Sequence, residues 1–161
     1  MDNINENEEV CYDFEYLYEG KNYFQDTGSK YQVLWFHLLK FKFQPNKQTT
    51  SWVNTIKRSI NEINEIRFNS KPKIKNGWSN FIKDSTEQER RFKLAVNDAA
   101  GETGLSKNTF YKSLAEAMSA ESVFNPIYTI DENIVKQYLL KYYNQNCMDH
   151  VYVLDKIENL F

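Results

Sequence analysis

The chain has 161 residues and a mass of 19.2 kDa, which suits one domain because single cores divide only beyond roughly 250 residues. Hydrophobic residues make up 41% and aromatic residues 16%, so a sizeable core can form, and five Gly and three Pro disfavour a turn-rich all-β architecture. No apolar run approaches the roughly 18 residues that span a bilayer, and the start MDNINENEEV lacks the features of a secretory signal. Cys11 and Cys147 are far apart and have no metal-ligand spacing. These features predict a cytoplasmic protein with no membrane segment and with reduced thiols.

Charge is distributed unevenly, although the net charge is −2. Residues 1–30 contain two Lys and eight acidic residues, giving −6, and residues 31–93 contain thirteen Lys or Arg and five acidic residues, giving +8. Residues 94–161 contain five Lys and nine acidic residues, giving −4. A basic middle between acidic ends either attracts an anionic partner or is neutralised within the molecule. We expect neutralisation, because most surface charge serves solvation.

The N-terminal part of the chain is predicted to be disordered over residues 1–8 and to form a short helix over 10–18. A break follows at residues 26–28 (DTG), where glycine and aspartate favour a turn. A second helix runs from about 29 to 43 and is apolar on more than one side, so we expect it to be mostly buried. It ends before Pro45, because the residue before a proline avoids the α region.

The next helix begins after a cap at Thr49, Thr50 or Ser51 and reaches about Arg67. One apolar stripe runs along it at steps of three and four residues; it consists of Trp52, Ile56, Ile60, Ile63 and Ile66. The short connection to the preceding helix predicts that the two are antiparallel neighbours. Residues 70–78 (SKPKIKNGW) then read as a basic loop, followed by a short helical turn to Ile82.

A capping box at residues 85–88 or 86–89 opens a further helix, which ends at Gly101 or Gly104. Residues 106–122 form another helix with Ser106 as its cap, and Asp131 caps a helix that reaches Tyr142. The tail HVYVLDKIENLF (150–161) is ambiguous between helix and strand. The sequence therefore predicts an all-α, single-domain bundle of five or six helices over residues 9–161, with an appended C-terminal segment.

Three motifs in fixed order, HLLKFKFQP (37–45), SWVNTI (51–56) and AVNDAAGETGL (95–105), resemble those of the Domain of Unknown Function 29 family of small helical bacterial proteins. The resemblance covers about residues 30–110, so residues 111–161 are expected to be a C-terminal extension. It implies a helical fold and leaves the activity open, because the family has no assigned function. Three matching residues are expected to be structural: His37, Lys40 and Trp52.

His37 has apolar neighbours along its helix and no HxxxH, HxxE or CxxC spacing around it. We interpret it as a structural histidine that hydrogen bonds inside the bundle, with a ligand or catalyst as the alternative. Lys40 is expected to reach the surface along its aliphatic stem rather than to act as a base. No catalytic residue, metal site or cofactor is predicted, and an enzyme is the less favoured interpretation.

Residues 99–114 (AAGETGLSKNTFYKSL) have the pattern of a helix-turn-helix, with Ala100, Gly104 and Phe110 at the characteristic positions. On this interpretation six residues would contact DNA: Ser106, Lys107, Asn108, Thr109, Tyr111 and Lys112. Two considerations oppose it. The surrounding third of the chain is net acidic, and the same turn is also explained as a plain connection between two helices.

A second candidate for phosphate contact is the basic stretch Arg67, Lys71, Lys73 and Lys75, which has Phe68 and Trp78 beside it for stacking. The alternative, which we favour at this point, is a solvated loop between two helices.

The leading functional hypothesis is a non-enzymatic helical interaction protein: a small cytoplasmic binder, inhibitor or immunity-type factor of the kind that mobile elements encode. Its partner is expected to be another protein, with nucleic acid as the alternative and the oligomeric state open. Three tyrosines expected to be exposed fit an interface: Tyr138, Tyr142 and Tyr143. The other hypotheses are a helix-turn-helix regulator or antitoxin, and a nuclease-like enzyme whose carboxylates converge only in three dimensions.

Overall fold

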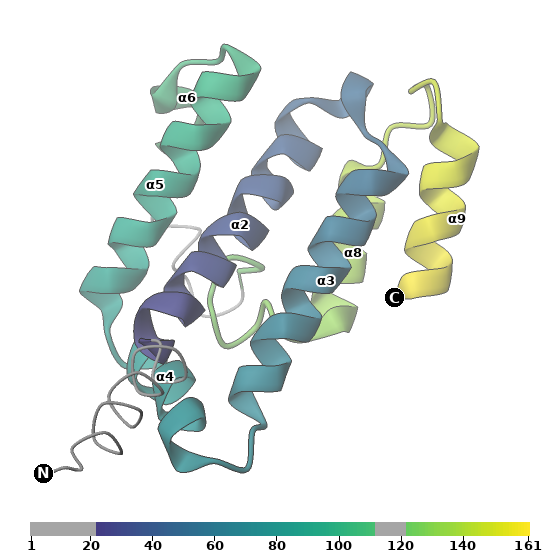
Figure 1. Ribbon diagram of the computed structural model, residues 1–161. Coiled ribbons are helices and arrows are strands. Elements are labelled where there is room, and N and C mark those ends of the chain that lie inside the picture. Colours follow the sequence, from purple (N-terminus) through teal and green to yellow (C-terminus); the bar gives the residue numbers. More distant parts are fainter. Residues whose placement is uncertain (1–21, 112–121) are drawn as a thin grey trace, which may run out of the picture.

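The computed structural model describes residues 22–111 and 122–161, and every regular element in these two ranges is helical (Figure 1). The prediction of an all-α fold is confirmed. The helix predicted over residues 10–18 and the disorder predicted over 1–8 lie outside the described residues. The elements in chain order are α2 (Tyr23–Phe43), η1 (Pro45–Lys47), α3 (Thr50–Arg67), α4 (Pro72–Ile82), α5 (Ser85–Thr103), α6 (Lys107–Tyr111), α8 (Glu132–Tyr142) and α9 (His150–Leu160).

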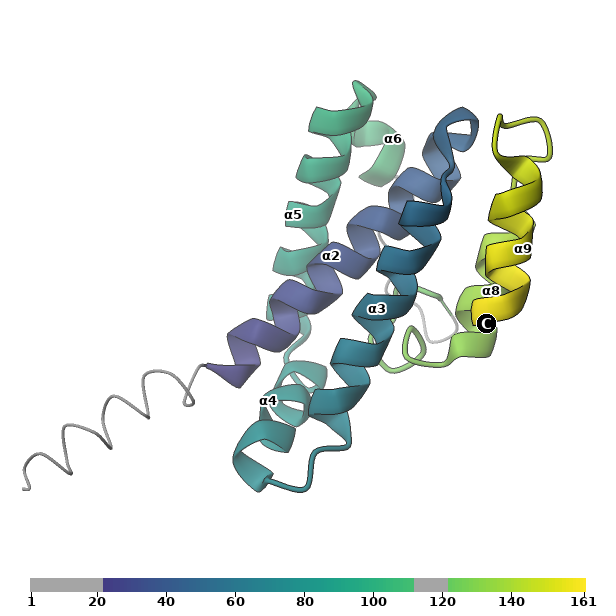
Figure 2. The ribbon, with the colours of Figure 1, turned by 45° about the vertical axis from the view of Figure 1, so that its right-hand side comes forward.

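Helix α2 is the centre of the bundle. It contacts α3, α4, α5 and α8, and two views show it between α5 and α3 (Figures 1 and 2). Because neighbours cover it on several sides, its large apolar side chains are almost fully buried: Tyr31, Leu34, Trp35, Leu38, Leu39 and Phe41. The helix ends at Phe43, before Pro45, as predicted.

The break predicted at residues 26–28 is wrong, because α2 runs through these residues. Packing explains why a glycine is needed in the helix here. A Cβ atom at Gly28 would lie 2.6 Å from Nε of Arg91 on α5, which is far too close. The glycine therefore makes room for a buried arginine rather than for a turn.

Helix α3 lies antiparallel to α2, as the short connection predicted (Figure 1). Thr49 is its N-cap, and its hydroxyl oxygen accepts a hydrogen bond from the N–H of Trp52 at 3.3 Å. The predicted apolar stripe is confirmed: Ile56, Ile60 and Ile63 are fully buried.

Residues 72–82 form helix α4 where a basic loop was predicted over 70–78. Pro72 is the first helical residue, a position where the missing N–H costs nothing because that group would have no partner in the helix. Gly77 lies inside the helix, where a Cβ atom would approach the carbonyl carbon and oxygen of Tyr23 to 2.6 and 2.7 Å. The glycine thus permits close approach of α4 to the start of α2, and it does not break the helix.

Helix α5 begins one residue earlier than the capping box at 85–88 implied and two residues earlier than the one at 86–89. Its N-cap is Asp84, whose carboxylate accepts a hydrogen bond from the N–H of Glu87 at 2.9 Å. The helix ends at Gly104, one of the two glycines predicted, with a φ of +77° that favours glycine.

Helices α8 and α9 pack against each other and cover α2 and α3, respectively. Asp131 caps α8 as predicted, because its carboxylate accepts a hydrogen bond from the N–H of Asn133 at 3.0 Å. The ambiguous tail is helical and buries Val153 and Ile157. Among the described helices, none has the length and hydropathy required to cross a membrane.

The three tyrosines predicted to form an exposed interface are instead partly buried and packed against the core. Tyr138 is the clearest case, since its hydroxyl donates a hydrogen bond to the carbonyl oxygen of Leu38 at 2.8 Å. Burial raises the pKa of Tyr138 well above its usual value. Tyr138 and Tyr142 therefore join α8 to α2, and Tyr143 donates a hydrogen bond to the carbonyl oxygen of His150 at the start of α9, so the three do not form an open aromatic surface.

Candidate functional site

His37 lies half-buried on α2, and its Nδ1–H donates a hydrogen bond to the carbonyl oxygen of Val33 at 3.0 Å. The ring of Phe36 packs against it edge-on, with the two ring centres 5.1 Å apart. Burial is the main cause that lowers the pKa of His37 below 6.5, so the imidazole is neutral at pH 7. Within the described residues the bond to Val33 is the only hydrogen bond of the ring, and it ties the side chain to its own helix.

Lys40, one turn further along α2, does not reach open solvent: its side chain is 7% exposed. The expectation that it extends to the surface is wrong. Its Nζ lies 2.6 Å from a carboxylate oxygen of Glu102 on α5, and 4.5 and 4.6 Å from the ring centres of Phe36 and Trp52. The family-motif residues Lys40 and Trp52 are thus in contact, in an arrangement that joins α2, α3 and α5.

Arg91 is a buried charge that the sequence interpretation missed. Its guanidinium donates to a carboxylate oxygen of Glu87 on its own helix and to three residues of α2: Gln25, Ser29 and Gln32. Hydrogen bonds from Arg90 and, to a lesser degree, from Arg91 lower the pKa of Glu87. The signal in the sequence was its position: Arg91 lies next to Phe92 and one turn before Ala95, on the buried face of α5.

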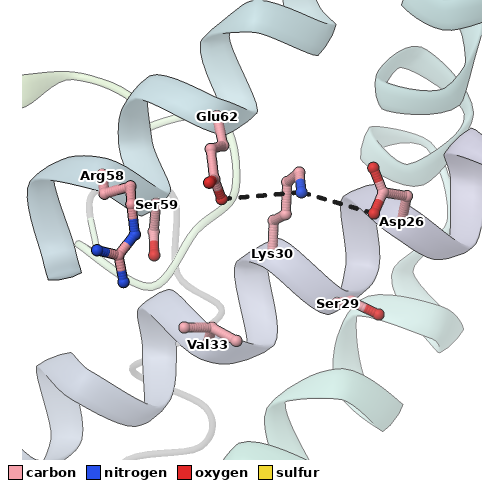
Figure 3. Close-up of a pocket in the computed structure, with 7 residues that line it drawn as sticks. All are labelled: Asp26, Ser29, Lys30, Val33, Arg58, Ser59 and Glu62. Atoms are coloured by element: carbon pink, nitrogen blue, oxygen red, sulfur yellow. Dashed lines mark ion pairs between the residues drawn. The ribbon is translucent and has the colours of Figure 1, made fainter.

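A pocket of about 200 Å³ lies between α2 and α3 (Figure 3). The amine of Lys30 lies between two carboxylates, 3.5 Å from Asp26 of its own helix and 3.7 Å from Glu62 of α3. Arg58 occupies the other end of the pocket, near Val33 (Figure 3). The pocket therefore combines two anions and two cations, whose charges cancel. Such a lining favours neither an anionic nor a cationic ligand.

The residues of the helix-turn-helix pattern lie at the end of α5 and in α6. Ser106, Lys107 and Asn108 are exposed, and the Ser106 hydroxyl oxygen accepts a hydrogen bond from the N–H of Asn108 at 3.1 Å. Phe110 is fully buried and packs edge-on against Phe43, with ring centres 4.9 Å apart. Thr109 and Tyr111 are half-buried, and Lys112 lies outside the described residues.

The basic stretch forms a compact surface where α3 ends and α4 begins, at the lower end of the molecule in Figures 1 and 2. We call it the basic corner and define it as Arg67, Phe68, Lys71, Lys73 and Lys75. Its three lysines are exposed, and the Phe68 ring is 68% exposed. Residues 67–83 contain one Arg and four Lys and no Asp or Glu, so this segment of the sequence carries a charge of +5.

The basic corner is connected to the core through aromatic side chains. The guanidinium carbon of Arg67 lies 4.6 Å from the ring centre of Phe68 and 5.0 Å from that of Trp78. Trp78 in turn donates from its indole N–H to the hydroxyl oxygen of Tyr31 at 3.2 Å, and Tyr31 donates to the carbonyl oxygen of Pro126 at 2.7 Å. Burial, as the largest effect, raises the pKa of Tyr31. The aromatic part of the corner therefore has a defined position.

The basic corner differs from the rest of the bundle in how its cations are paired. Four lysines elsewhere pair with a carboxylate on a different helix: Lys30 with Glu62, Lys40 with Glu102, Lys57 with Glu132 and Lys136 with Glu158. In the corner, Arg67, Lys71 and Lys75 form no ion pair with any residue that the structure describes. The positive charge of Lys71 and Lys75 is therefore not used in ion pairs that join the described helices.

Within residues 22–111 and 122–161 no group of three or more His, Cys, Asp or Glu side chains is arranged to hold a metal ion. A family model described as Domain of unknown function DUF29 matches residues 15–129, a wider range than the 30–110 predicted. The match includes the basic corner, whereas α8 and α9 lie beyond its C-terminal end. No curated protein matches the chain, and no solved structure matches it.

Proposed function

The chain belongs to the DUF29 family, whose description assigns no activity, and from this premise we propose that it is a non-enzymatic interaction module that binds an anionic partner through the basic corner. The observation that carries the proposal is that two exposed corner lysines and Arg67 form no ion pair with any residue that the structure describes. Lys71 and Lys75 are exposed, and Arg67, Lys71 and Lys75 pair with no described carboxylate. A cluster of positive charges on a low-dielectric surface attracts counter-ions and anionic partners from solution.

The contrast with the paired lysines supports a role in binding rather than in folding. A lysine that pairs across two helices stabilises their packing: Lys57 joins α3 to α8, and Lys136 joins α8 to α9. Lys71 and Lys75 make no such contact with any described residue, and like charges placed close together disfavour the compact state. This cost is offset when an anionic partner neutralises them. The partner is a protein with an acidic surface or another polyanion.

The proposal is tested by measuring the binding of the purified chain to heparin, a generic polyanion, at several salt concentrations. We expect Lys71→Glu combined with Lys75→Glu to weaken binding about 5- to 30-fold, at roughly 0.5–1 kcal/mol for each reversed charge. The matched control is Lys47→Glu combined with Lys141→Glu, which reverses two exposed charges outside the corner. Equal losses in the two variants would show that only net charge matters, and the proposal would be wrong.

The helix-turn-helix regulator is the second candidate. It is favoured by the left-handed Gly104 turn and by the exposed Ser106, Lys107 and Asn108. A gel shift with duplex DNA at low salt tests it, since Lys107→Ala should reduce the affinity if this residue contacts DNA. An unchanged shift would remove this candidate and leave the basic corner unaffected.

A further inference from the structure

We propose that the anionic partner of the basic corner is a single-stranded nucleic acid, whose phosphates lie against the corner lysines and one of whose bases stacks on Phe68. This inference rests on the binding function proposed above and adds the chemical class of the partner. It requires two properties of one surface: positive charge for the phosphates and an open aromatic face for a base.

The first property is the local charge. Lys71, Lys73 and Lys75 are exposed within a short segment, next to Arg67, and no acidic residue occurs between 67 and 83. The whole protein carries a net charge of −2, so attraction for a phosphate backbone must come from this local surface rather than from the total charge.

The second property is the position of Phe68. The Phe68 ring is 68% exposed, so it contributes little to the core and is accessible to a partner. Its backbone N–H ends α3 by donating to the carbonyl oxygen of Asn64 at 2.9 Å, and its ring lies 4.6 Å from the guanidinium carbon of Arg67. An aromatic ring held beside a guanidinium is a surface on which any base can stack, because every base has a π face.

The aromatic support of the corner reduces the entropic cost of binding. Arg67 packs on Trp78, and Trp78 is hydrogen bonded to Tyr31, which is fully buried. A ring whose neighbours are ordered in advance loses less freedom when a base packs on it.

A single strand fits this surface better than a duplex or an acidic protein. Reading a duplex requires an element that enters the major groove, whereas α4 packs against α2 and α3, and the corner consists of the end of α3, the connecting turn and the first turn of α4. Paired bases in a duplex also have no free face to stack on Phe68. An acidic peptide would satisfy the lysines, but it supplies no flat partner for the ring.

The experiment is a double-mutant cycle in which both molecules are changed. Fluorescence anisotropy measures the affinity of the full chain for an oligothymidylate and an oligouridylate of about 15 nucleotides, and for an abasic strand of equal length and charge. The protein variant is Phe68→Ala. Its matched control is Tyr152→Ala, which removes another exposed aromatic ring, 69% exposed, from α9. Circular dichroism checks that both variants remain folded.

We expect Phe68→Ala to weaken binding to the strands that carry bases about fivefold or more, and to leave binding to the abasic strand unchanged. Tyr152→Ala should match the unmodified chain on all strands. Comparison of the thymidylate and the uridylate distinguishes DNA from RNA. Lys71→Ala and Lys75→Ala should each reduce the slope of log affinity against log salt by about 0.7.

Two results would overturn the inference: equal affinity of the unmodified chain for abasic and base-carrying strands, or equal affinity of Phe68→Ala and the unmodified chain for the latter. If either occurs while heparin binding still depends on Lys71 and Lys75, the anion-binding function stands and only the nucleic-acid assignment is wrong. If the chain binds neither heparin nor any strand, both proposals are wrong.

Discussion

Replacement of Gly77 by alanine is expected to separate α4 from α2. The added Cβ atom would lie 2.6 Å from the carbonyl carbon and 2.7 Å from the carbonyl oxygen of Tyr23. Carbon atoms in favourable contact are about 3.5–4.0 Å apart, so a shift on the order of 1 Å is needed. The nearest atom of all is Cβ of Tyr23, and neither this atom nor the two carbonyl atoms move when the side chain rotates, so no rotamer change can relieve the contacts. The helices themselves must therefore move apart.

The magnitude follows from two opposing effects. Overpacking of a closely packed contact costs about 1–3 kcal/mol, and a clash with backbone lies in the upper part of that range. Alanine recovers up to about 1 kcal/mol because it is a better helix former than glycine. We therefore expect Gly77→Ala to lower the free energy of unfolding by about 1–2 kcal/mol, which corresponds to a decrease in Tm of about 2–8 °C for a chain of this size.

Gly101→Ala is the matched control, because it places the same methyl group in helix α5 with no atom within 4 Å. Only the helix-propensity effect applies there, so we expect a gain of about 0.5–1 kcal/mol. Urea unfolding followed by circular dichroism measures both variants. The two changes should have opposite signs. A Gly77→Ala protein as stable as the unmodified chain would refute the close contact between α4 and α2.

Three further predictions concern the buried polar groups. Glu102→Gln should destabilise the fold by about 1 kcal/mol in urea unfolding, because it leaves the amine of Lys40 buried without its carboxylate. The control Glu89→Gln breaks an exposed ion pair with Lys93 and should cost less than about 0.5 kcal/mol. Equal costs in the two variants would contradict the argument from burial. Arg91→Lys should cost about 2–3 kcal/mol, since an ammonium cannot reproduce the five hydrogen bonds of the guanidinium, and a change near zero in Tm would show that they contribute nothing. The pKa of His37 is lowered below 6.5 in the folded state, so the unfolded chain binds more protons as the pH falls through that value. The free energy of unfolding should therefore decrease as the pH is lowered from about 7.5 to about 5.5. His37→Gln should show a smaller decrease than the unmodified chain in the same pH series.

Features whose causes lie within one turn of helix were predictable from the sequence. The apolar stripe of α3, its threonine cap, the end of α2 before Pro45 and the cap at Asp131 all depend on residues no more than four positions apart. The basic residues and aromatic side chains of the corner were also visible, because they are adjacent in the chain.

Errors arose where a local rule competed with packing. Pro72 and Gly77 are helix breakers by propensity, yet one starts α4 and the other allows it to approach α2. Gly28 was interpreted as a turn residue for the same reason, although its role is to make space for Arg91. Lys40 was expected to reach the surface along its aliphatic stem, and the sequence did not reveal its buried partner, because Glu102 is 62 residues away.

By itself the sequence determined that this protein is helical, where α3 and α8 begin and end, and that a run of cations lies over residues 67–75. These properties follow from backbone hydrogen bonding, capping and hydrophobic periodicity, which act over a few residues. Only the tertiary structure decided which charges are neutralised and which remain available. Ion pairs such as Lys40 with Glu102 and Lys57 with Glu132 join residues that are distant in the chain and meet only after the helices pack. Lys71 and Lys75, in contrast, lie on a surface where no described carboxylate pairs with them.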